Sequence, residues 1–244
     1  HLKLVKLNKF LICWIIDYLD KIIKNKLVSF LSSFNAERKR RISSSTTFDK
    51  KALLEWNNVI NSKKLKNNKT QLLNYFNYSK NIKYLHHQNK SYFSHPLRVA
   101  NMAFNFSKYS KSPKNLVILA LLHNIVETSN YSTNYLNKFL GKFITKQIKV
   151  LTVNRKKQWN TKYKEKYYQA INSHHKNTRI IKIIDKLDNL FIIGSCKSDL
   201  TRKRYISEIE DYILPMVKKD IPILSKYFYG LIIQSYKLGY YGNK

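Results

Sequence analysis

The feature that most constrains this sequence is a run of seven consecutive apolar residues, Leu116 to Leu122, which ends at His123. A segment that is apolar on every side has no face to turn to water, so it predicts a helix through the centre of a core. Ser112 and Pro113 precede the run. Serine caps helices and proline fits their first turn, so this helix is expected to begin here. The rest of the chain must pack around it.

The residues after position 48 continue with helical patterns and almost none of the alternation typical of strands. The 244 residues include only five glycines and four prolines, which are the residues that interrupt helices most strongly. Pro96 is expected to open a segment to about Tyr109, and Pro222 the last helix, which Gly239 can end. We therefore expect an all-α fold with one helical domain over residues 51–244.

The first 35 residues carry a separate amphipathic pattern. Apolar residues such as Leu4, Leu11 and Ile22 recur at helical spacing in a segment that also carries six lysines, which predicts a basic amphipathic helix over residues 1–35. Two interpretations stay open: the helix packs on the domain or a neighbour, or it lies on a membrane surface or docks to a partner. Residues 36–50 combine a basic cluster with a run of Ser and Thr, and we interpret them as a linker.

The charge of the chain points to a polyanionic partner. There are 46 Lys and Arg against 14 Asp and Glu, a formal net charge of +32, which favours nucleic acid or an anionic membrane surface as partner. Codons rich in A and T are an alternative source of the lysines, although they do not explain the scarcity of acids. No apolar run approaches the ~18 residues of a membrane span, so an integral membrane protein is not expected. Cys13 and Cys196 show no spacing typical of a disulfide framework or zinc finger.

Two basic clusters are candidates for contact with RNA phosphates. The first, in the predicted linker, comprises Arg38, Lys39, Arg40 and Arg41. The second comprises Arg155, Lys156 and Lys157. It precedes residues 159–168, where aromatic and cationic residues alternate and could follow an RNA backbone. The alternatives are a solvated linker and an amphipathic helix whose tyrosines face the core. No RNA-binding motif occurs, so recognition of phosphate and shape is expected.

Polar residues interrupt the apolar segments at three places. His95 stands before Pro96, His123 and Asn124 follow the central run, and Asp185 lies within Ile183 to Leu187. A buried histidine or aspartate needs a hydrogen-bond partner, a counter-charge or a metal ion, because an unsatisfied one costs several kcal/mol. Each alone is typical of a structural polar residue, whereas several in this order indicate a shared site.

The order and flanks of these residues resemble the HD superfamily of metal-dependent phosphohydrolases, and within it the hydrolase domain of the RelA/SpoT family. The matching segments are Tyr92 to Ala100, Ala120 to Thr128 and Lys182 to Leu190, within a resemblance over residues 80–230. The resemblance implies an HD-domain-like helical bundle that cleaves the 3′-pyrophosphate from (p)ppGpp. It implies a divalent ion, typically manganese, and a carboxylate, Glu127, that acts on the attacking water. The implied metal ligands are His95, His123, Asn124 and Asp185.

The sequence also departs from the family pattern. Asn124 replaces the defining aspartate, Thr128 replaces the second acid of a Glu-Asp pair, and Asp188 stands where the family has histidine. The stretch that clamps the guanine nucleotide is shortened to His87 to Ser91 and lacks its glycine. An amide oxygen is a weaker donor to a hard cation than a carboxylate, so we expect an impaired or empty metal site and a vestigial Glu127.

Three functional hypotheses follow. The first is a non-catalytic, RNA-binding structural component of a ribonucleoprotein, with a mitochondrial or other organellar ribosome as the expected particle, rRNA and neighbouring subunits as partners, and no cofactor. The alternative is an active manganese-dependent (p)ppGpp 3′-pyrophosphohydrolase or related nucleotide phosphohydrolase, for which a bacterial-type cytoplasm is the alternative location. The third is a regulatory or assembly factor that binds nucleotide without cleaving it.

Overall fold

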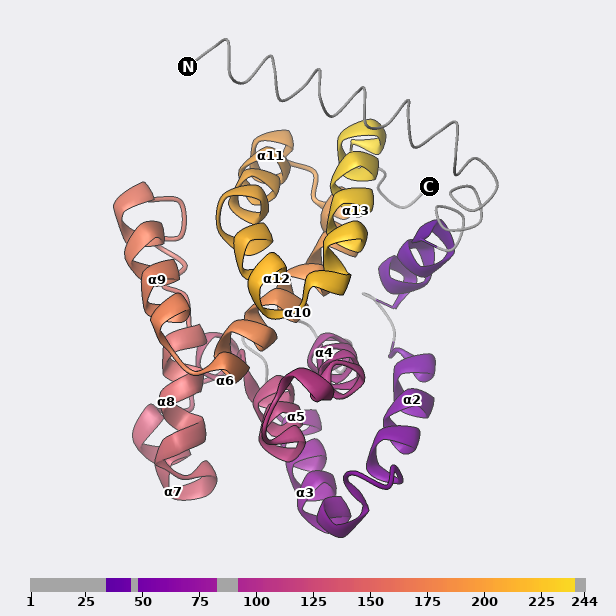
Figure 1. Cartoon of the computed structure of the whole chain (residues 1–244), viewed down its shortest axis with the longest axis vertical. Helices are drawn as coiled ribbons and strands as arrows, with labels where there is room; N and C mark the ends of the chain where they lie inside the picture. Colours follow the sequence, from indigo (N-terminus) through magenta and orange to yellow (C-terminus); the bar gives the residue numbers. More distant parts are fainter. Residues whose placement is uncertain (1–33, 45–47, 83–91, 240–244) are drawn as a thin grey trace. The chain divides into compact units, whose positions relative to one another are not determined.

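The computed structural model describes residues 34–44, 48–82 and 92–239. Every regular element within these ranges is a helix, which confirms the predicted all-α fold (Figure 1). The first half of the domain contains α2 (Lys50–Ile60), η1 (Lys66–Asn68), α3 (Lys69–Lys80), α4 (Ser94–Asn105), η2 (Ser107–Tyr109), α5 (Pro113–Leu122), α6 (Ile125–Thr128), α7 (Thr133–Leu140) and α8 (Lys142–Leu151). The second half contains α9 (Thr161–Ser173), α10 (Lys176–Ile192), η3 (Ile193–Ser195), α11 (Asp199–Glu208), η4 (Ile209–Ile213), α12 (Leu214–Asp220), η5 (Pro222–Leu224) and α13 (Ser225–Leu238).

Contacts within the chain define two units, residues 1–40 and residues 41–244. The predicted amphipathic helix over residues 1–35 lies outside the described residues except for its last two. Residues 34–43 are helical, so the beginning of the segment interpreted as a linker is part of a helix. No helix in the described part of the chain is long and apolar enough to cross a membrane.

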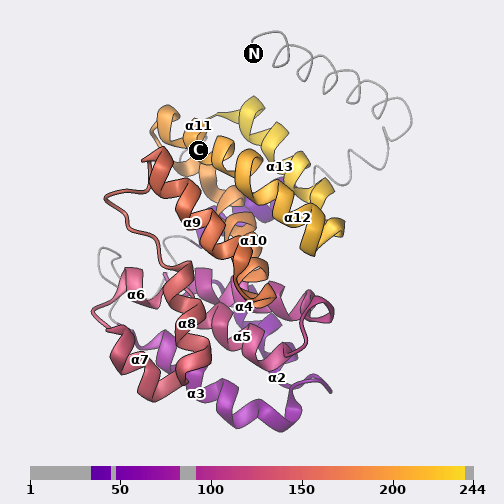
Figure 2. The same ribbon diagram turned by 60° about the vertical axis from the view of Figure 1, so that its left-hand side comes forward.

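Helix α5 lies at the centre of the core, as its apolar run predicts. All seven residues from Leu116 to Leu122 are at most 3% exposed. Ser112 caps the helix by accepting a hydrogen bond from the Asn115 backbone N–H, and Pro113 occupies the first turn. Helices α4 and α10 both pack against α5 (Figure 2). The three helices that carry the polar interruptions are therefore neighbours.

Aromatic packing joins α2, α3 and the start of α4. Trp56, which is 1% exposed, stacks on Phe76 at 5.4 Å between ring centroids. Phe76 meets Phe93 edge to face at 5.1 Å. Stacked and edge-to-face pairs of this kind stabilise a core beyond the area they bury. This packing fixes the position at which α4 begins, one residue before His95.

The helix boundaries follow the capping residues with two differences from expectation. Gly141 has φ 79° between α7 and α8, a conformation that side chains with a Cβ rarely adopt. Pro222 opens the short turn η5, so the last helix begins at Ser225 and not at the proline. Helix α4 ends at Asn105, and a separate turn, η2, reaches Tyr109. Gly239 ends α13 with φ 57°, as predicted.

A π-helical turn, η4, lies between α11 and α12. Pro215 follows it as the second residue of α12. Proline has no backbone N–H and its ring collides with the preceding turn of an α-helix, so a wider turn lets the chain continue. The turn carries Ile209 and Ile213 into the core, where neither is exposed.

Candidate functional site

Three of the predicted ligands come together from α4, the end of α5 and α10. His95 is the second residue of α4, His123 is the C-cap of α5, and Asp185 lies in the middle of α10. All three are buried, and one ligand atom from each lies within 4.8 Å of the others. We refer to His95, His123 and Asp185 as the triad.

Hydrogen bonds orient both imidazoles. Nδ1 of His95 lies 2.8 Å from Oδ2 of Asp188, and Nδ1 of His123 lies 2.7 Å from the carbonyl oxygen of Ala120. An acceptor at Nδ1 places the proton there and leaves the Nε2 lone pair for another role. The Nε2 atoms of His95 and His123 lie 3.3 and 3.6 Å from Oδ1 of Asp185.

Asp185 is held as an anion. Its burial opposes ionisation, but the nearby Lys182 and the two histidines keep the pKa of its carboxyl well below the usual range. Lys182 Nζ lies 3.3 Å from Oδ2, and the Asn189 side-chain amide donates to Oδ1 at 2.8 Å. Oδ1 of Asp185 therefore faces the two histidines of the triad, and Oδ2 faces Lys182.

The donor set of the triad fits a divalent transition-metal ion. Nε2 of His123 is buried and has no hydrogen-bond partner, which is costly unless the atom binds something. Two imidazole nitrogens and one carboxylate oxygen are ligands that manganese, iron and zinc accept. The amide nitrogen of Asn124 donates to the Tyr92 hydroxyl at 2.9 Å, so its oxygen is the donor atom left for an ion.

Glu127 and Thr128 hold the chain around the triad. Glu127, on α6, accepts a 2.7 Å hydrogen bond from the Val153 backbone N–H and forms a 2.8 Å ion pair with Arg155. Its side chain is 4% exposed, whereas that of Arg155 is 63% exposed. The Thr128 hydroxyl donates to the Asn124 carbonyl oxygen at 2.7 Å. Glu127 therefore fixes the segment that carries Arg155.

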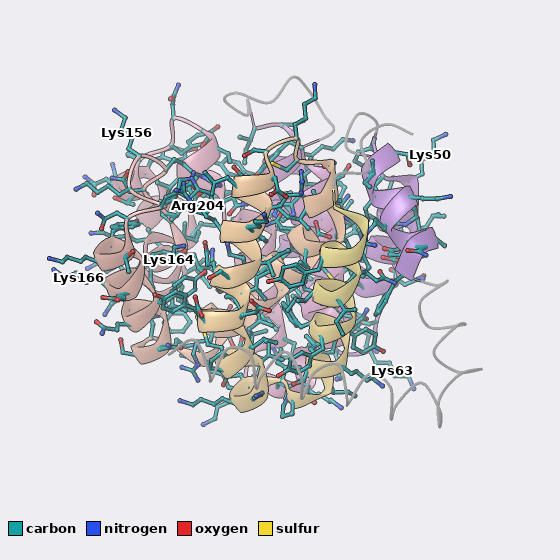
Figure 3. All side chains as sticks on the ribbon, turned by 90° about the horizontal axis from the view of Figure 1, so that it is seen from above. Lys50, Lys63, Lys156, Lys164, Lys166 and Arg204 are labelled. Atoms are coloured by element: carbon teal, nitrogen blue, oxygen red, sulfur yellow. The ribbon has the colours of Figure 1, made fainter. Side chains whose placement is uncertain are left out.

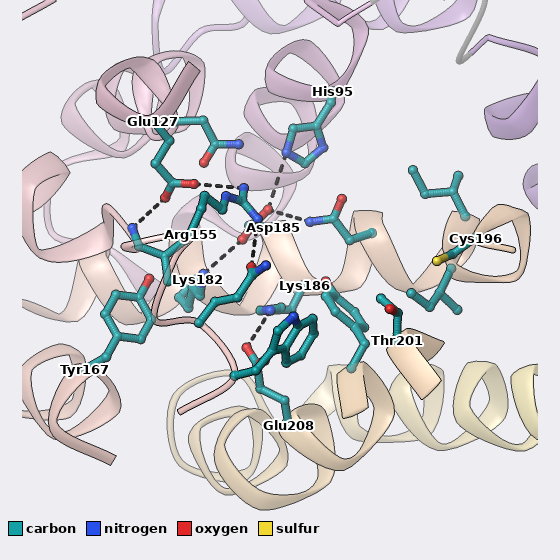
Figure 4. Close-up of a pocket in the computed structure, with 18 of the residues that line it drawn as sticks. His95, Glu127, Arg155, Tyr167, Lys182, Asp185, Lys186, Cys196, Thr201 and Glu208 are labelled. Carbon is teal, nitrogen blue, oxygen red and sulfur yellow. Dashed lines mark hydrogen bonds and ion pairs between the residues drawn. The ribbon is translucent and has the colours of Figure 1, made fainter. Parts of the chain in front are cut away.

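Two residues of the triad, His95 and Asp185, line a cavity of about 650 Å³ (Figure 4). This volume is typical of a small-molecule site. Cationic residues of its wall are Arg98, Arg155, Lys164, Lys182 and Lys186. Aromatic residues of its wall are Tyr92, Trp159, Tyr163, Tyr167, Tyr168 and Tyr205. Cations that can neutralise phosphate and rings that can stack on a base suit an anionic ligand with an aromatic part.

The wall of the cavity contains a second buried ion pair. Oε1 of Glu208 accepts hydrogen bonds from Lys186 Nζ and the Tyr168 hydroxyl, both at 2.6 Å. Burial raises the pKa of Glu208, but Lys186 and Tyr168 outweigh it and lower the pKa to about 2. Lys186 also lies 4.2 Å from the centre of the Tyr205 ring.

A buried ion-pair cluster holds Asp188 behind His95. Arg98 donates to both carboxylate oxygens of Asp188 at 2.9 Å, and Arg41 forms a further ion pair with it. Arg98 also reaches Asp49 at 3.3 Å. Burial opposes the charge of Asp188, but the two arginines and His95 bring its pKa well below the usual range. Asp188 is 0% exposed and binds other residues, so it does not replace the missing aspartate as a ligand.

The predicted RNA-contacting residues lie in three environments. Arg38, Lys39 and Arg40 belong to the helical residues 34–43, where Arg40 pairs with Glu37. Arg41 is buried, paired with Asp188 and 4.1 Å from the centre of the Phe191 ring, which corrects its interpretation as part of a linker. Arg155 belongs to the cavity wall, and Lys156 and Lys157 are exposed. Tyr167 and Tyr168, which belong to residues 159–168, face the core.

Five residues that were not predicted from the sequence complete the site. They are Arg98, Lys182, Lys186, Asn189 and Glu208. The only sequence signal for Lys182 and Lys186 is their position inside an apolar segment around Asp185, since a buried lysine needs an anion nearby. Arg98 carries the same signal within the apolar start of α4.

The all-α bundle and its triad define a class of helical protein in which two histidines and one aspartate from different parts of the chain meet at one buried point. Residues 92–190 match the family model of the HD domain, so the chain carries an HD domain, and the match spans the triad. A solved structure of a metazoan ortholog of SpoT, described as hydrolyzing ppGpp, is similar with a TM-score of 0.53 at 17% identity. The alignment covers 68% of this chain and 93% of that chain. No curated protein sequence matches.

Proposed function

We propose that the cavity is the active site of a divalent-metal-dependent phosphohydrolase whose substrate is a phosphorylated nucleoside such as (p)ppGpp. The observation that carries the proposal is the unpartnered Nε2 of His123 facing Asp185 inside a triad with both imidazoles oriented by hydrogen bonds. The HD-domain match supports the class of enzyme. The aromatic and cationic wall of the cavity supports the class of substrate.

The residues of the chain have separate tasks in this proposal. His95, His123 and Asp185 hold the ion, with the Asn124 oxygen as a neutral fourth donor. A divalent ion bound there supplies Lewis-acid chemistry and lowers the pKa of water. Arg155 presents an exposed guanidinium at the cavity, held by Glu127, and binds substrate phosphate. The aromatic residues stack on the base, and Lys182 keeps Asp185 ionised.

Asn124 determines how tightly the site is expected to bind a metal ion. An asparagine removes one negative charge next to the ion compared with the family's aspartate, and Glu127 is engaged by Arg155 and Val153. We therefore expect weak metal binding and slow turnover. Replacing Asn124 by Asp restores the charge and should increase both.

The test combines metal binding with hydrolysis. Purified protein is titrated with Mn²⁺ by calorimetry, and pyrophosphate release from ppGpp is measured with and without Mn²⁺. Both signals should be lost in His123→Ala, increased in Asn124→Asp, and unchanged in His174→Ala, a histidine outside the triad. Binding of Mn²⁺ without release of pyrophosphate or phosphate from any guanosine or adenosine polyphosphate would contradict catalysis and favour the non-catalytic hypothesis.

A second function, contact with RNA in a ribonucleoprotein, is favoured by where the acidic residues lie. Six described acids are engaged in internal pairs or caps: Asp49, Glu127, Asp185, Asp188, Glu208 and Asp220. The cations that face them cancel their charge, so the excess of lysine lies on the surface. Figure 3 shows Lys50, Lys63, Lys156 and Lys166 pointing outward, and all four are exposed.

The assembly that fits this second proposal is a ribonucleoprotein such as an organellar ribosome. Affinity for structured RNA should fall steeply with salt, because each neutralised phosphate adds to the slope. Co-sedimentation of the protein with ribosomal particles from mitochondria would support the assembly. A flat salt response of binding would contradict RNA contact, without bearing on the cavity.

A further inference from the structure

A group of five aromatic residues connects α3 with α7 at the surface. We call it the α3–α7 aromatic cluster, and its members are Tyr75, Tyr78, Tyr131, Tyr135 and Phe139. Phe139 lies 4.4 Å from Tyr78 and 5.4 Å from Tyr75 between ring centroids. Tyr131 links Tyr78, at 5.5 Å, to Tyr135, at 5.2 Å. The rings therefore form one continuous set.

Two rings of the cluster are open to water, and the others are partly so. Tyr135 is 46% exposed and Phe139 is 39% exposed, and the other three rings are only partly buried. Phe143, at the start of α8, is a further exposed ring at 52%. Adjacent large aromatic residues left open to water are typical of a surface that binds something.

The charge around the cluster selects an anionic partner. Helices α3, α7 and α8 contain no acidic residue. Their exposed lysines are Lys69, Lys80, Lys138, Lys142, Lys146 and Lys149. Exposed lysines on the same helices as exposed rings, with no carboxylate on those helices, favour a ligand that carries both negative charge and flat apolar groups.

We propose that the α3–α7 aromatic cluster and the lysines of α7 and α8 bind single-stranded nucleic acid. Tyr135 and Phe139 stack on unpaired bases, and Lys138 and Lys142 contact the backbone phosphates. Single strands are favoured over duplexes because only unpaired bases can reach an aromatic side chain. The inference rests on the proposed contact with RNA and names the surface and the form of the ligand; it is independent of the cavity.

The test measures binding of a fluorescent 12-nucleotide RNA single strand to the full chain by anisotropy. Tyr135→Ser should weaken binding by about 5-fold or more, the loss expected for one stacked base, and Tyr135→Trp should keep the affinity. Tyr229→Ser is the matched control, because Tyr229 is 42% exposed on α13, away from the cluster. Lys138→Glu with Lys142→Glu should weaken binding and reduce the salt slope, whereas Lys218→Glu with Lys219→Glu on α12 should do so much less.

The outcomes separate the surface from the broader proposal. If the native protein binds no RNA, single-stranded or duplex, RNA contact itself is wrong. If it binds the single strand but the Tyr135 and Lys138/Lys142 variants match their controls, only the surface is wrong. A preference for a duplex of the same length overturns the stacking role. Loss of binding to vesicles with anionic lipid in Tyr135→Ser, with RNA affinity unchanged, overturns the assignment in favour of a membrane surface.

Discussion

Asp188→Asn is the substitution that tests the architecture of the site most directly. Asp188 is 0% exposed and accepts hydrogen bonds from Nε and Nη2 of Arg98, from Arg41 and from His95. The asparagine keeps the shape but removes the charge, so Arg41 and Arg98 each lose the ion pair with Asp188, while Arg98 keeps its ion pair with Asp49, at 3.3 Å. Breaking a buried ion pair typically costs about 3–5 kcal/mol. A domain with about 5–15 kcal/mol of stability should remain folded but be much weakened.

The same substitution should weaken the metal site. Asp188 accepts the Nδ1 proton of His95, which turns Nε2 toward Asp185. Loss of such a partner behind a ligand typically costs 10- to 100-fold in metal affinity. Urea unfolding measures the stability, and titration with Mn²⁺ by calorimetry measures the affinity, which should fall by that factor.

Asp220→Asn supplies the matched control. Asp220 is also buried and accepts two hydrogen bonds from one arginine, Arg179, at 2.6 and 3.0 Å, but it contacts no triad residue. It should lose stability without losing Mn²⁺ affinity. Arg41→Gln also separates stability from metal affinity, because it removes one partner of Asp188 and leaves the contact between Asp188 and His95. Equal Mn²⁺ affinity of the Asp188→Asn and Asp220→Asn proteins would refute the positioning role of Asp188.

Three further predictions concern the packing and the second ion pair. The pKa of Glu208 is lowered to about 2 in the folded chain, against about 4.3 in the unfolded chain. Its ionisation should therefore contribute about 3 kcal/mol to stability above pH 4.5, and this contribution is lost as the pH falls toward 2. The difference in stability between the native protein and Glu208→Gln, measured by urea unfolding, should shrink from pH 6 to pH 3. Trp56→Ala removes a side chain that is 1% exposed and should lower the free energy of unfolding by about 3–5 kcal/mol; a loss below 1 kcal/mol would show that the site collapses around the gap. Gly141→Ala meets no atom within 4 Å but keeps φ at 79°, so it should cost about 1–3 kcal/mol from backbone strain alone, and an unchanged thermal midpoint would contradict this.

The features that sequence patterns predict are those that depend on neighbouring residues. The buried helix α5, its Ser112 and Pro113 start and the stop at Gly239 follow from local spacing, and the structure has all of them. The triad was also visible, since each member interrupts an apolar segment. The geometry of the triad cannot be predicted from the sequence, because the spacing of residues along three helices does not give the distances between the helices.

The ion pairs behind the site could not be read from the sequence. Asp188 is separated from Arg98 by 90 residues and from Arg41 by 147, and no periodicity connects such positions. Arg41 therefore looked like part of a flexible basic segment, and Asp188 like a lost family residue. Glu127 likewise gives no local sign that it pairs with Arg155, 28 positions further along the chain.

These contacts change the meaning of the departures from the family pattern. Asp188 and Thr128 are not simple losses, since Asp188 orients His95 and neutralises two buried arginines, while Thr128 closes a hydrogen bond to the Asn124 backbone. That leaves Asn124 as the departure that acts on the ligand set itself. Because Lys182 offsets the one anionic ligand, Asp185, at 3.3 Å, the immediate surroundings of the ion carry almost no net negative charge. A carboxylate at position 124 would shift that balance by a full unit, so the difference between a weak and a strong metal site rests on this one side chain.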